Sequence, residues 1–160
     1  MKVKQGILLT IGLLVGLLGA GFSTEASAAS NTVPTKFQGT FYQYASHKKW
    51  DKLVIRKHSA QISGPGYAKA FKLKPTAKSS HKLAFKVTGK DRHQVFFTLN
   101  SKLKDEASSP LPMQGFSLAQ RKIGHKTYKV VRGFQSGYWF DFIKGQKITH
   151  RYAGMANGKY

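Results

Sequence analysis

Six histidines are the first candidates for chemistry in this sequence of 160 residues. A nuclease of the ribonuclease type needs two histidines and a lysine around one phosphate, with one histidine acting as the base and the other as the acid. No two histidines form a His-x-His or His-x-x-x-His pair, and most lie beside a cation, as in His47-Lys48 and Arg92-His93. This pattern favours a solvated basic surface, and a His/Lys-dependent nuclease stays as an alternative function. The six are His47, His58, His81, His93, His125 and His150.

Carboxylates are scarce, with six Asp and Glu in the whole chain. Glycoside hydrolysis needs two of them facing each other across a bond. Asp105 and Glu106 are adjacent and are expected to point apart, whereas Asp51 and Asp91 lie in turn-like sequence where Asp is common. Asp141 stands out because it lies inside an aromatic run. Two interpretations of it stay open: a surface carboxylate paired with a neighbouring lysine, or a buried or ligand-facing one.

Other catalytic and metal-binding patterns are missing from the sequence. The chain has no Cys, which excludes disulfides, thiolate metal sites and a cysteine nucleophile. It also lacks the Gly-x-Ser-x-Gly motif and a glycine-rich phosphate loop. We therefore expect no catalytic residue, no metal ligand and no cofactor, and a protein that is not an enzyme.

Positive charge is the strongest signal, because 27 Lys and Arg against 6 Asp and Glu give a formal net charge of +21. Lysine is a hydrated point charge, whereas arginine provides forked, planar recognition, so an excess of lysine favours diffuse attraction to polyanions. The lysines predicted to provide this attraction are Lys48, Lys49, Lys52, Lys57, Lys72, Lys74, Lys86 and Lys129.

Aromatic side chains are abundant, with 11 Phe, 7 Tyr and 2 Trp. Most are expected in the core of a domain of this size. A subset is a candidate lining for a cavity that takes a small apolar or sugar-like ligand, with core packing as the alternative for each member. This subset is Phe41, Trp50, Tyr138 and Trp139.

The first 28 residues have the features of a secretory signal peptide. Lys2 and Lys4 precede an apolar stretch from Gly6 to Phe22, and Ala26-Ser27-Ala28 supplies small residues for cleavage after Ala28 or after Ala29. An uncleaved membrane anchor is the alternative. Cleavage leaves 25 basic and 5 acidic residues, with no later apolar run long enough to span a membrane.

Alternation with a period of two dominates the rest of the chain and predicts short antiparallel strands. We expect a flexible leader at 29–35 and one all-β domain at 36–160, a small antiparallel barrel of about eight or nine strands, with a sandwich as the alternative. Ser101–Gln114 is predicted to form a loop with one helical turn at 103–107. The predicted strands are 37–44, 52–58, 60–63, 68–74, 82–88, 94–99, 116–121, 127–134 and 138–143.

The segment from Pro34 to Tyr44 (PTKFQGTFYQY) and the aromatic stretch at 137–140 resemble small secreted, Lys-rich proteins of lactic-acid-type Gram-positive bacteria. This resemblance implies secretion and a β-rich domain. More distantly, Gly39-Thr40-Phe41 resembles the Gly-x-Trp motif of lipocalin-like barrels, with Phe in place of Trp. That resemblance implies that Arg151 packs over Phe41.

Together these features predict a secreted or loosely surface-attached, non-enzymatic binding protein. Its expected partners are anionic cell-wall polymers such as teichoic acid, or other extracellular polyanions, without sequence-specific binding of nucleic acid and without a transmembrane segment after signal removal. Besides the nuclease, a cationic antibacterial or inhibitor protein is an alternative function.

Overall fold

The computed structural model describes residues 28–100 and 109–156. The predicted signal peptide up to residue 27 and the predicted helical turn at 103–107 lie outside the described residues. Ala28 and Ala29, which flank the predicted cleavage positions, are exposed.

Strands make up most of the described chain, as the alternating sequence predicts. Two short 3-10 helices, η1 (Thr35–Phe37) and η2 (Ser79–His81), are the helical segments within the described residues. The strands are β1 (Gly39–Ser46), β2 (Lys49–Arg56), β3 (Ser59–Ser63), β4 (Phe71–Leu73), β5 (Lys86–Lys90), β6 (Val95–Thr98), β7 (Phe116–Ile123), β8 (Lys126–Gln135), β9 (Tyr138–Lys144) and β10 (Ala153–Met155).

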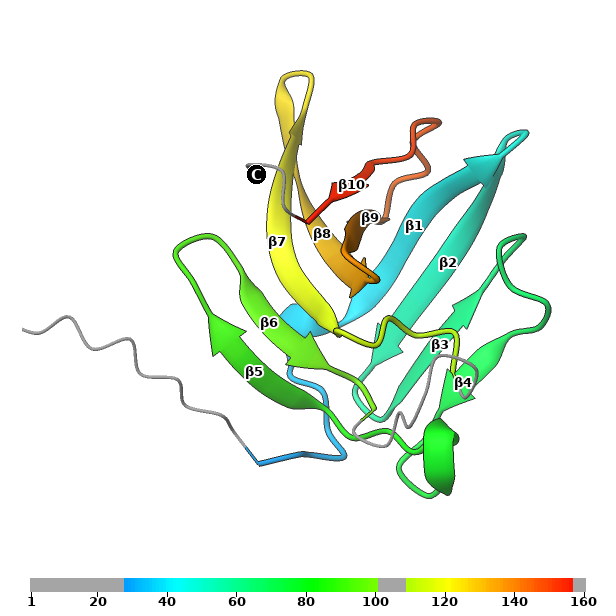
Figure 1. Cartoon of the computed structure of the whole chain (residues 1–160), viewed down its shortest axis with the longest axis vertical. Helices are drawn as coiled ribbons and strands as arrows, with labels where there is room; N and C mark the ends of the chain where they lie inside the picture. Colours follow the sequence, from blue (N-terminus) through cyan, green and yellow to red (C-terminus); the bar gives the residue numbers. More distant parts are fainter. Residues whose placement is uncertain (1–27, 101–108, 157–160) are drawn as a thin grey trace, which may run out of the picture.

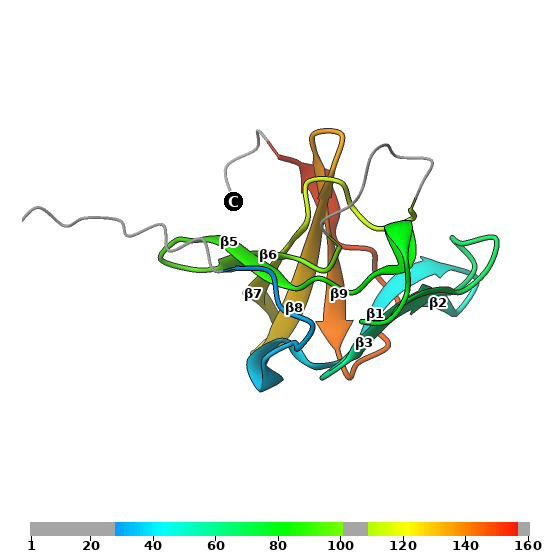
Figure 2. The ribbon, with the colours of Figure 1, turned by 90° about the horizontal axis from the view of Figure 1, so that it is seen from below.

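The strands form one antiparallel sheet in the order β4-β3-β2-β1-β9-β8-β7-β6-β5, and β10 adds to β9. Figures 1 and 2 show the sheet curved, with β5 and β6 at one end, β2 and β3 at the other, and β8 and β9 between them. The all-β barrel prediction is confirmed, and the barrel is an open half-barrel. A single bridge between Lys74 and Lys82 connects the region after β4 to the region before β5.

The main core covers the inner face of this sheet. Residues from neighbouring strands meet there because alternate side chains of each strand point to the same side, as with Phe41, Leu53 and Phe142. The opposite, outer face of β7–β9 carries a second cluster of Ala119, Val130 and Ile143. Ile148 and Tyr152, from the segment that leads into β10, pack against this second cluster. The sheet is therefore covered on both faces at β7–β9.

The segment predicted as a flexible leader, 29–35, is instead attached to the domain. Ser30 forms an isolated bridge with Phe85, with N···O distances of 2.7 and 2.8 Å. The side chain of Val33 is fully buried, and its backbone N–H donates to the carbonyl of Lys57 at 2.8 Å. The apolar side chain of Val33 provides the physical reason, because burying it in the core favours a fixed leader.

Several boundaries also differ from the predicted ones. The strand predicted at 68–74 is shortened to β4, and the one at 82–88 begins only at Lys86. The predicted list lacked β10, a strand of three residues whose central position is Gly154. Its pairing with β9 depends on the return of the C-terminal segment, which a local pattern does not encode.

Candidate functional site

Asp141 is the centre of a buried charge cluster on the outer face of the sheet. Its side chain is fully buried, so the interpretation as a surface carboxylate paired with lysine is wrong. Arg132 donates from Nε to Oδ1 at 2.7 Å and from Nη2 to Oδ2 at 3.1 Å. Arg121 donates from Nε to Oδ2. One carboxylate therefore compensates two guanidinium groups, and the cluster keeps one net positive charge.

Trp139 provides an aromatic face for both arginines. The Cζ atoms of Arg132 and Arg121 lie 4.6 and 5.0 Å from its ring centroid, within the range of cation–π attraction. Arg121 also lies 4.8 Å from the ring of Tyr152. On β10, Gly154 allows close packing, because a Cβ there would lie 2.9 Å from Cζ2 of Trp139. The arginine heads are thus held by a carboxylate and by aromatic rings.

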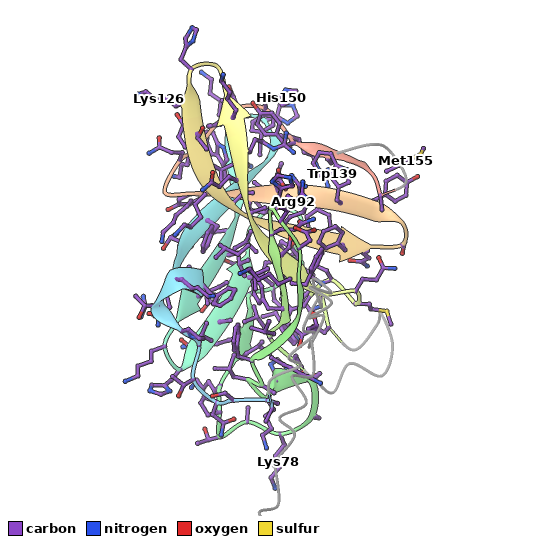
Figure 3. The ribbon with its side chains drawn as sticks, turned by 90° about the vertical axis from the view of Figure 1, so that its left-hand side faces the viewer. Lys78, Arg92, Lys126, Trp139, His150 and Met155 are labelled. Carbon is purple, nitrogen blue, oxygen red and sulfur yellow. The ribbon has the colours of Figure 1, made fainter. Side chains whose placement is uncertain are left out.

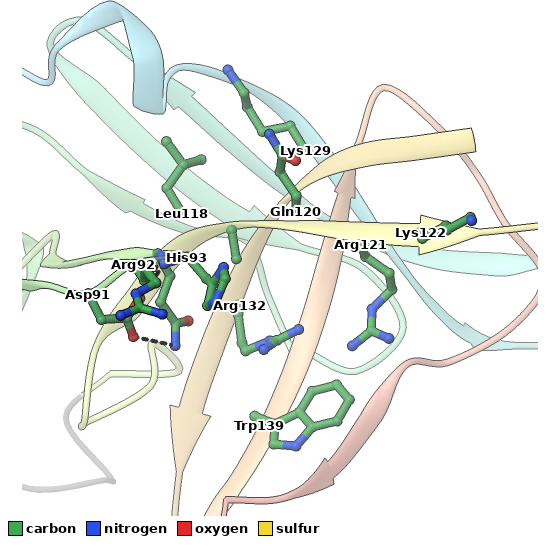
Figure 4. Close-up of a pocket in the computed structure, with 12 residues that line it drawn as sticks. Asp91, Arg92, His93, Leu118, Gln120, Arg121, Lys122, Lys129, Arg132 and Trp139 are labelled. Atoms are coloured by element: carbon green, nitrogen blue, oxygen red, sulfur yellow. Dashed lines mark hydrogen bonds between the residues drawn. The ribbon is translucent and has the colours of Figure 1, made fainter. Parts of the chain in front are cut away.

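Arg121, Arg132 and Trp139 line a groove of about 970 Å³ at the edge of β7. The edge is available because the pairing of β7 with β6 extends only from Phe116 to Leu118. In Figure 4, Arg121 and Arg132 lie between β7 and the indole of Trp139. Five basic side chains and one Asp line the groove, so its lining carries an excess of positive charge. The basic ones are Arg92, Arg121, Lys122, Lys129 and Arg132.

The turn between β5 and β6 borders the groove and is held by Asp91. Its Oδ1 accepts the backbone N–H groups of His93 at 2.7 Å and Gln94 at 2.8 Å. Burial opposes the charge of Asp91, but these hydrogen bonds and the one from the Gln94 side chain outweigh it and hold the pKa of Asp91 below its ordinary value. Ser117 of β7 donates to Gln94 Oε1 at 2.7 Å, which ties the turn to the sheet. Arg92 and His93 are therefore placed at the groove.

The lysines predicted to bind polyanions are spread over the surface, and one of them, Lys129, lines the groove. The others lie in the β1–β2 turn (Lys48), on β2 (Lys49 and Lys52), in the β2–β3 turn (Lys57), on β4 (Lys72), directly after β4 (Lys74) and on β5 (Lys86). All of these side chains are exposed except that of Lys86, which is half-buried. Figure 3 illustrates the spread, with Lys78 at one end of the molecule and Lys126 at the other. Their charge is distributed over broad faces.

The four aromatic residues predicted to line one cavity lie in different places. Phe41 is fully buried in the core, and Tyr138 is 54% exposed. Trp139 lines the groove, whereas Trp50 lines a separate hollow of about 250 Å³ with Lys52 and Lys147. Trp50 Nε1 donates to the carbonyl of Ile148 at 3.0 Å. The four residues therefore do not form a shared cavity.

Two further residues singled out from the sequence have other neighbours than expected. The cation over the Phe41 ring is the Nζ of Lys144, at 5.8 Å from the centroid. Arg151 instead lines a different cavity, together with Gln43 and Tyr67.

All six histidines belong to the described residues: His81 ends η2, and the other five lie in separate turns or loops. His93 borders the groove, and His150 stacks edge-to-face on Tyr152 with 4.5 Å between the ring centroids. No cluster of three His, Asp or Glu suited to a metal ion occurs in the described ranges. Across these same residues, no helix has the length and apolar character needed to cross a membrane.

Arg121 and Arg132 are site residues that the sequence reasoning missed. The excess of lysine in the sequence favoured diffuse attraction to polyanions over a specific pair of arginines. A signal was nonetheless present in the sequence. Arg132 lies on the predicted strand just before the one that carries Trp139 and Asp141, a short turn separates the two strands, and alternation places Trp139 and Asp141 on the same face.

A comparison with protein families, curated proteins and solved structures found no match for the chain.

Proposed function

We propose that this protein is an extracellular, non-enzymatic binding protein that holds an anionic cell-wall polymer, such as teichoic acid, in the groove beside β7. The observation that carries the proposal is the sharing of Asp141 by Arg121 and Arg132, which line a groove together with three more cations. The predicted signal peptide supports the extracellular location.

The groove suits a polymer with repeated phosphates better than a single small anion. Arg121 and Arg132 are fixed in position by Asp141 and Trp139, so little side-chain entropy is lost when an anion binds. Within the described residues, no salt bridge involves Arg92, Lys122 or Lys129, whose charges surround the groove. The lysines on the remaining surface extend the positive potential and attract distant parts of the same polymer.

The distribution of histidines supports a function without catalysis. Acid–base cleavage of a phosphodiester needs two proton-transfer groups at one phosphate. The groove contains one histidine, His93. The nuclease alternative therefore has no specific observation in its favour.

The test compares two triple variants that remove the same charge. The groove variant is Arg92→Gln, Lys122→Gln and Lys129→Gln, and the control is Lys57→Gln, Lys72→Gln and Lys78→Gln, all exposed residues. Binding of the mature protein to isolated Gram-positive walls is measured by sedimentation over a series of salt concentrations. We expect roughly tenfold weaker binding and a flatter salt slope for the groove variant, and a much smaller effect for the control.

Walls stripped of teichoic acid identify the polymer, and we expect them to bind much less protein. Equal losses in the two triple variants would mean that diffuse charge alone drives association, and the groove proposal would be rejected. Cleavage of RNA that disappears with His93→Ala would replace the binding function by the nuclease alternative.

A further inference from the structure

A third cavity, of about 420 Å³, lies away from the groove and from the hollow at Trp50, between the inner face of β1–β2 and the segment before β10. Gln43 of β1, Asp51 of β2, Tyr67 and Arg151 line it, and Phe140 of β9 adds an aromatic wall. One carboxylate and one guanidinium make its lining formally neutral, in a chain with a net charge of +21. A polyanion is therefore not the ligand that this cavity favours.

Gln43 is the unusual residue of this cavity. It is 4% exposed and occupies an inner-face position two residues after the fully buried Phe41. Its Nε2 is buried and has no hydrogen-bond partner among residues 28–100 and 109–156. A buried amide donor without an acceptor is unfavourable, and a hydrophobic side chain would serve the core better. A ligand that brings an acceptor into the cavity would satisfy this amide once the Gln43 side chain turns toward it.

Asp51 supplies an acceptor beside this donor. It is the register partner of Gln43, so the two side chains lie on the same face of adjacent strands. Its Oδ1 accepts the backbone N–H of Gly66 at 2.8 Å, which fixes the carboxylate. Gly64 makes this close approach possible, because a Cβ there would lie 2.5 Å from Asp51 Oδ1. A fixed acceptor and an unpartnered donor therefore stand next to each other.

Tyr67 adds a hydroxyl to the same cavity. Burial, and secondarily the charge of Asp51, raises the pKa of Tyr67 well above its ordinary value, so its hydroxyl stays protonated. Gln135 and Ser46 contribute further neutral hydrogen-bonding groups. The lining thus combines an aromatic surface with several neutral donors and acceptors, which is the composition of a small-molecule site.

We propose that this cavity, named here the Gln43 cavity after the residue that defines it, binds one neutral sugar ring. A hydroxyl of a sugar donates to Asp51 and accepts from Gln43 Nε2 at the same time, and an adjacent hydroxyl reaches Tyr67 or Arg151. An apolar ligand would leave the Gln43 amide without an acceptor, and an anion would be repelled by the Asp51 carboxylate. This binding is separate from the proposed polymer binding in the groove.

The test uses amide NMR spectra of the mature protein during titration with D-glucose, D-galactose and N-acetyl-D-glucosamine. The side-chain NH₂ signals of Gln43 are assigned as those lost in Gln43→Met. We expect at least one sugar to shift these signals together with the backbone signals of Gly66 and Tyr67. Gln43→Met should weaken binding more than tenfold while keeping the fold, because it replaces an unsatisfied buried amide by an apolar side chain.

The matched control is Gln61→Met on β3, a half-buried glutamine outside the cavity, which should leave sugar binding unchanged. Asp51→Asn gives a second variant that should weaken binding. L-alanine serves as a zwitterionic probe. Shifts caused by alanine but by none of the sugars, sugar binding that Gln43→Met does not change, or no shift with any probe, as for a cavity that holds only water, would each overturn the proposal.

Discussion

Arg132 and Asp141 stand directly opposite each other on β8 and β9, and their side chains form two hydrogen bonds on the outer face of the sheet. A carboxylate held in this way by a planar guanidinium is strongly oriented. Because Arg121 reaches the same carboxylate from β7, Asp141 links three adjacent strands through one side chain.

Asp141→Asn is expected to destabilise the protein by about 3–5 kcal/mol, because two guanidinium groups would remain in the cluster without a counter-charge. Urea denaturation followed by circular dichroism measures the change. As a control, Asp91→Asn removes an exposed carboxylate and should change stability by about 0.5 kcal/mol or less near neutral pH. Equal effects of the two substitutions would show that Asp141 has no special role in the cluster.

Gly154→Ala should displace Trp139 and lower the affinity of the groove for anionic polymers. The added Cβ would come within 3.0 Å of the indole, so either the ring or β10 must shift, at a cost of about 1–3 kcal/mol. Near-UV circular dichroism reports the tryptophan environment. Gly89→Ala is the matched control, since its Cβ would meet its nearest atom only at 3.8 Å. An unchanged spectrum and unchanged wall binding in Gly154→Ala would contradict the role given to this packing.

Stability should decrease as the pH falls through the lowered pKa of Asp91. The folded-state pKa lies below the ordinary value of 3.8, so ionised Asp91 stabilises the fold above pH 3.8 and this contribution is lost at lower pH. Melting temperatures of the wild type and Asp91→Asn, measured as a function of pH, test this. We expect the wild type to be slightly more stable near neutral pH and the two proteins to converge in acid. A difference in melting temperature between the two proteins that does not change with pH would mean that the Asn side chain alters the packing of the turn and that the charge of Asp91 does not stabilise it.

Val33 should contribute to stability although it precedes the first strand. A protein that starts at residue 36 loses this buried side chain and should be less stable than one that starts at Ala29 by about 1.5–3 kcal/mol. Thermal unfolding compares the two forms, and Thr32→Ala in the longer form is the control for an exposed neighbour. Equal stability of the two forms would mean that the leader contributes nothing to the stability of the fold.

The predicted signal peptide should be removed during secretion. N-terminal sequencing of protein from the culture medium should find Ala29 or Ser30 as the first residue. A protein that retains residues 2–25 would contradict the signal-peptide prediction.

The sequence by itself determined that most of the chain forms strands and which face each strand residue occupies, although it missed β10 and several strand boundaries. Alternation placed Trp139, Asp141 and Ile143 on one face and Phe140 and Phe142 on the other, because side chains of a strand point to opposite sides in turn. It also determined the excess of positive charge. These properties depend on neighbours in the chain, so local patterns are enough to predict them.

Only the tertiary structure decided which charges meet. The contact of Arg121 with Asp141 depends on the register of β7, β8 and β9, and the packing of Gly154 on Trp139 depends on the return of the C-terminal segment. The Gln43 cavity likewise brings Asp51 of β2 near Arg151, 100 positions later in the chain. Such contacts form between residues far apart in sequence, where strand pairing and chain return set the distances and no periodicity records them.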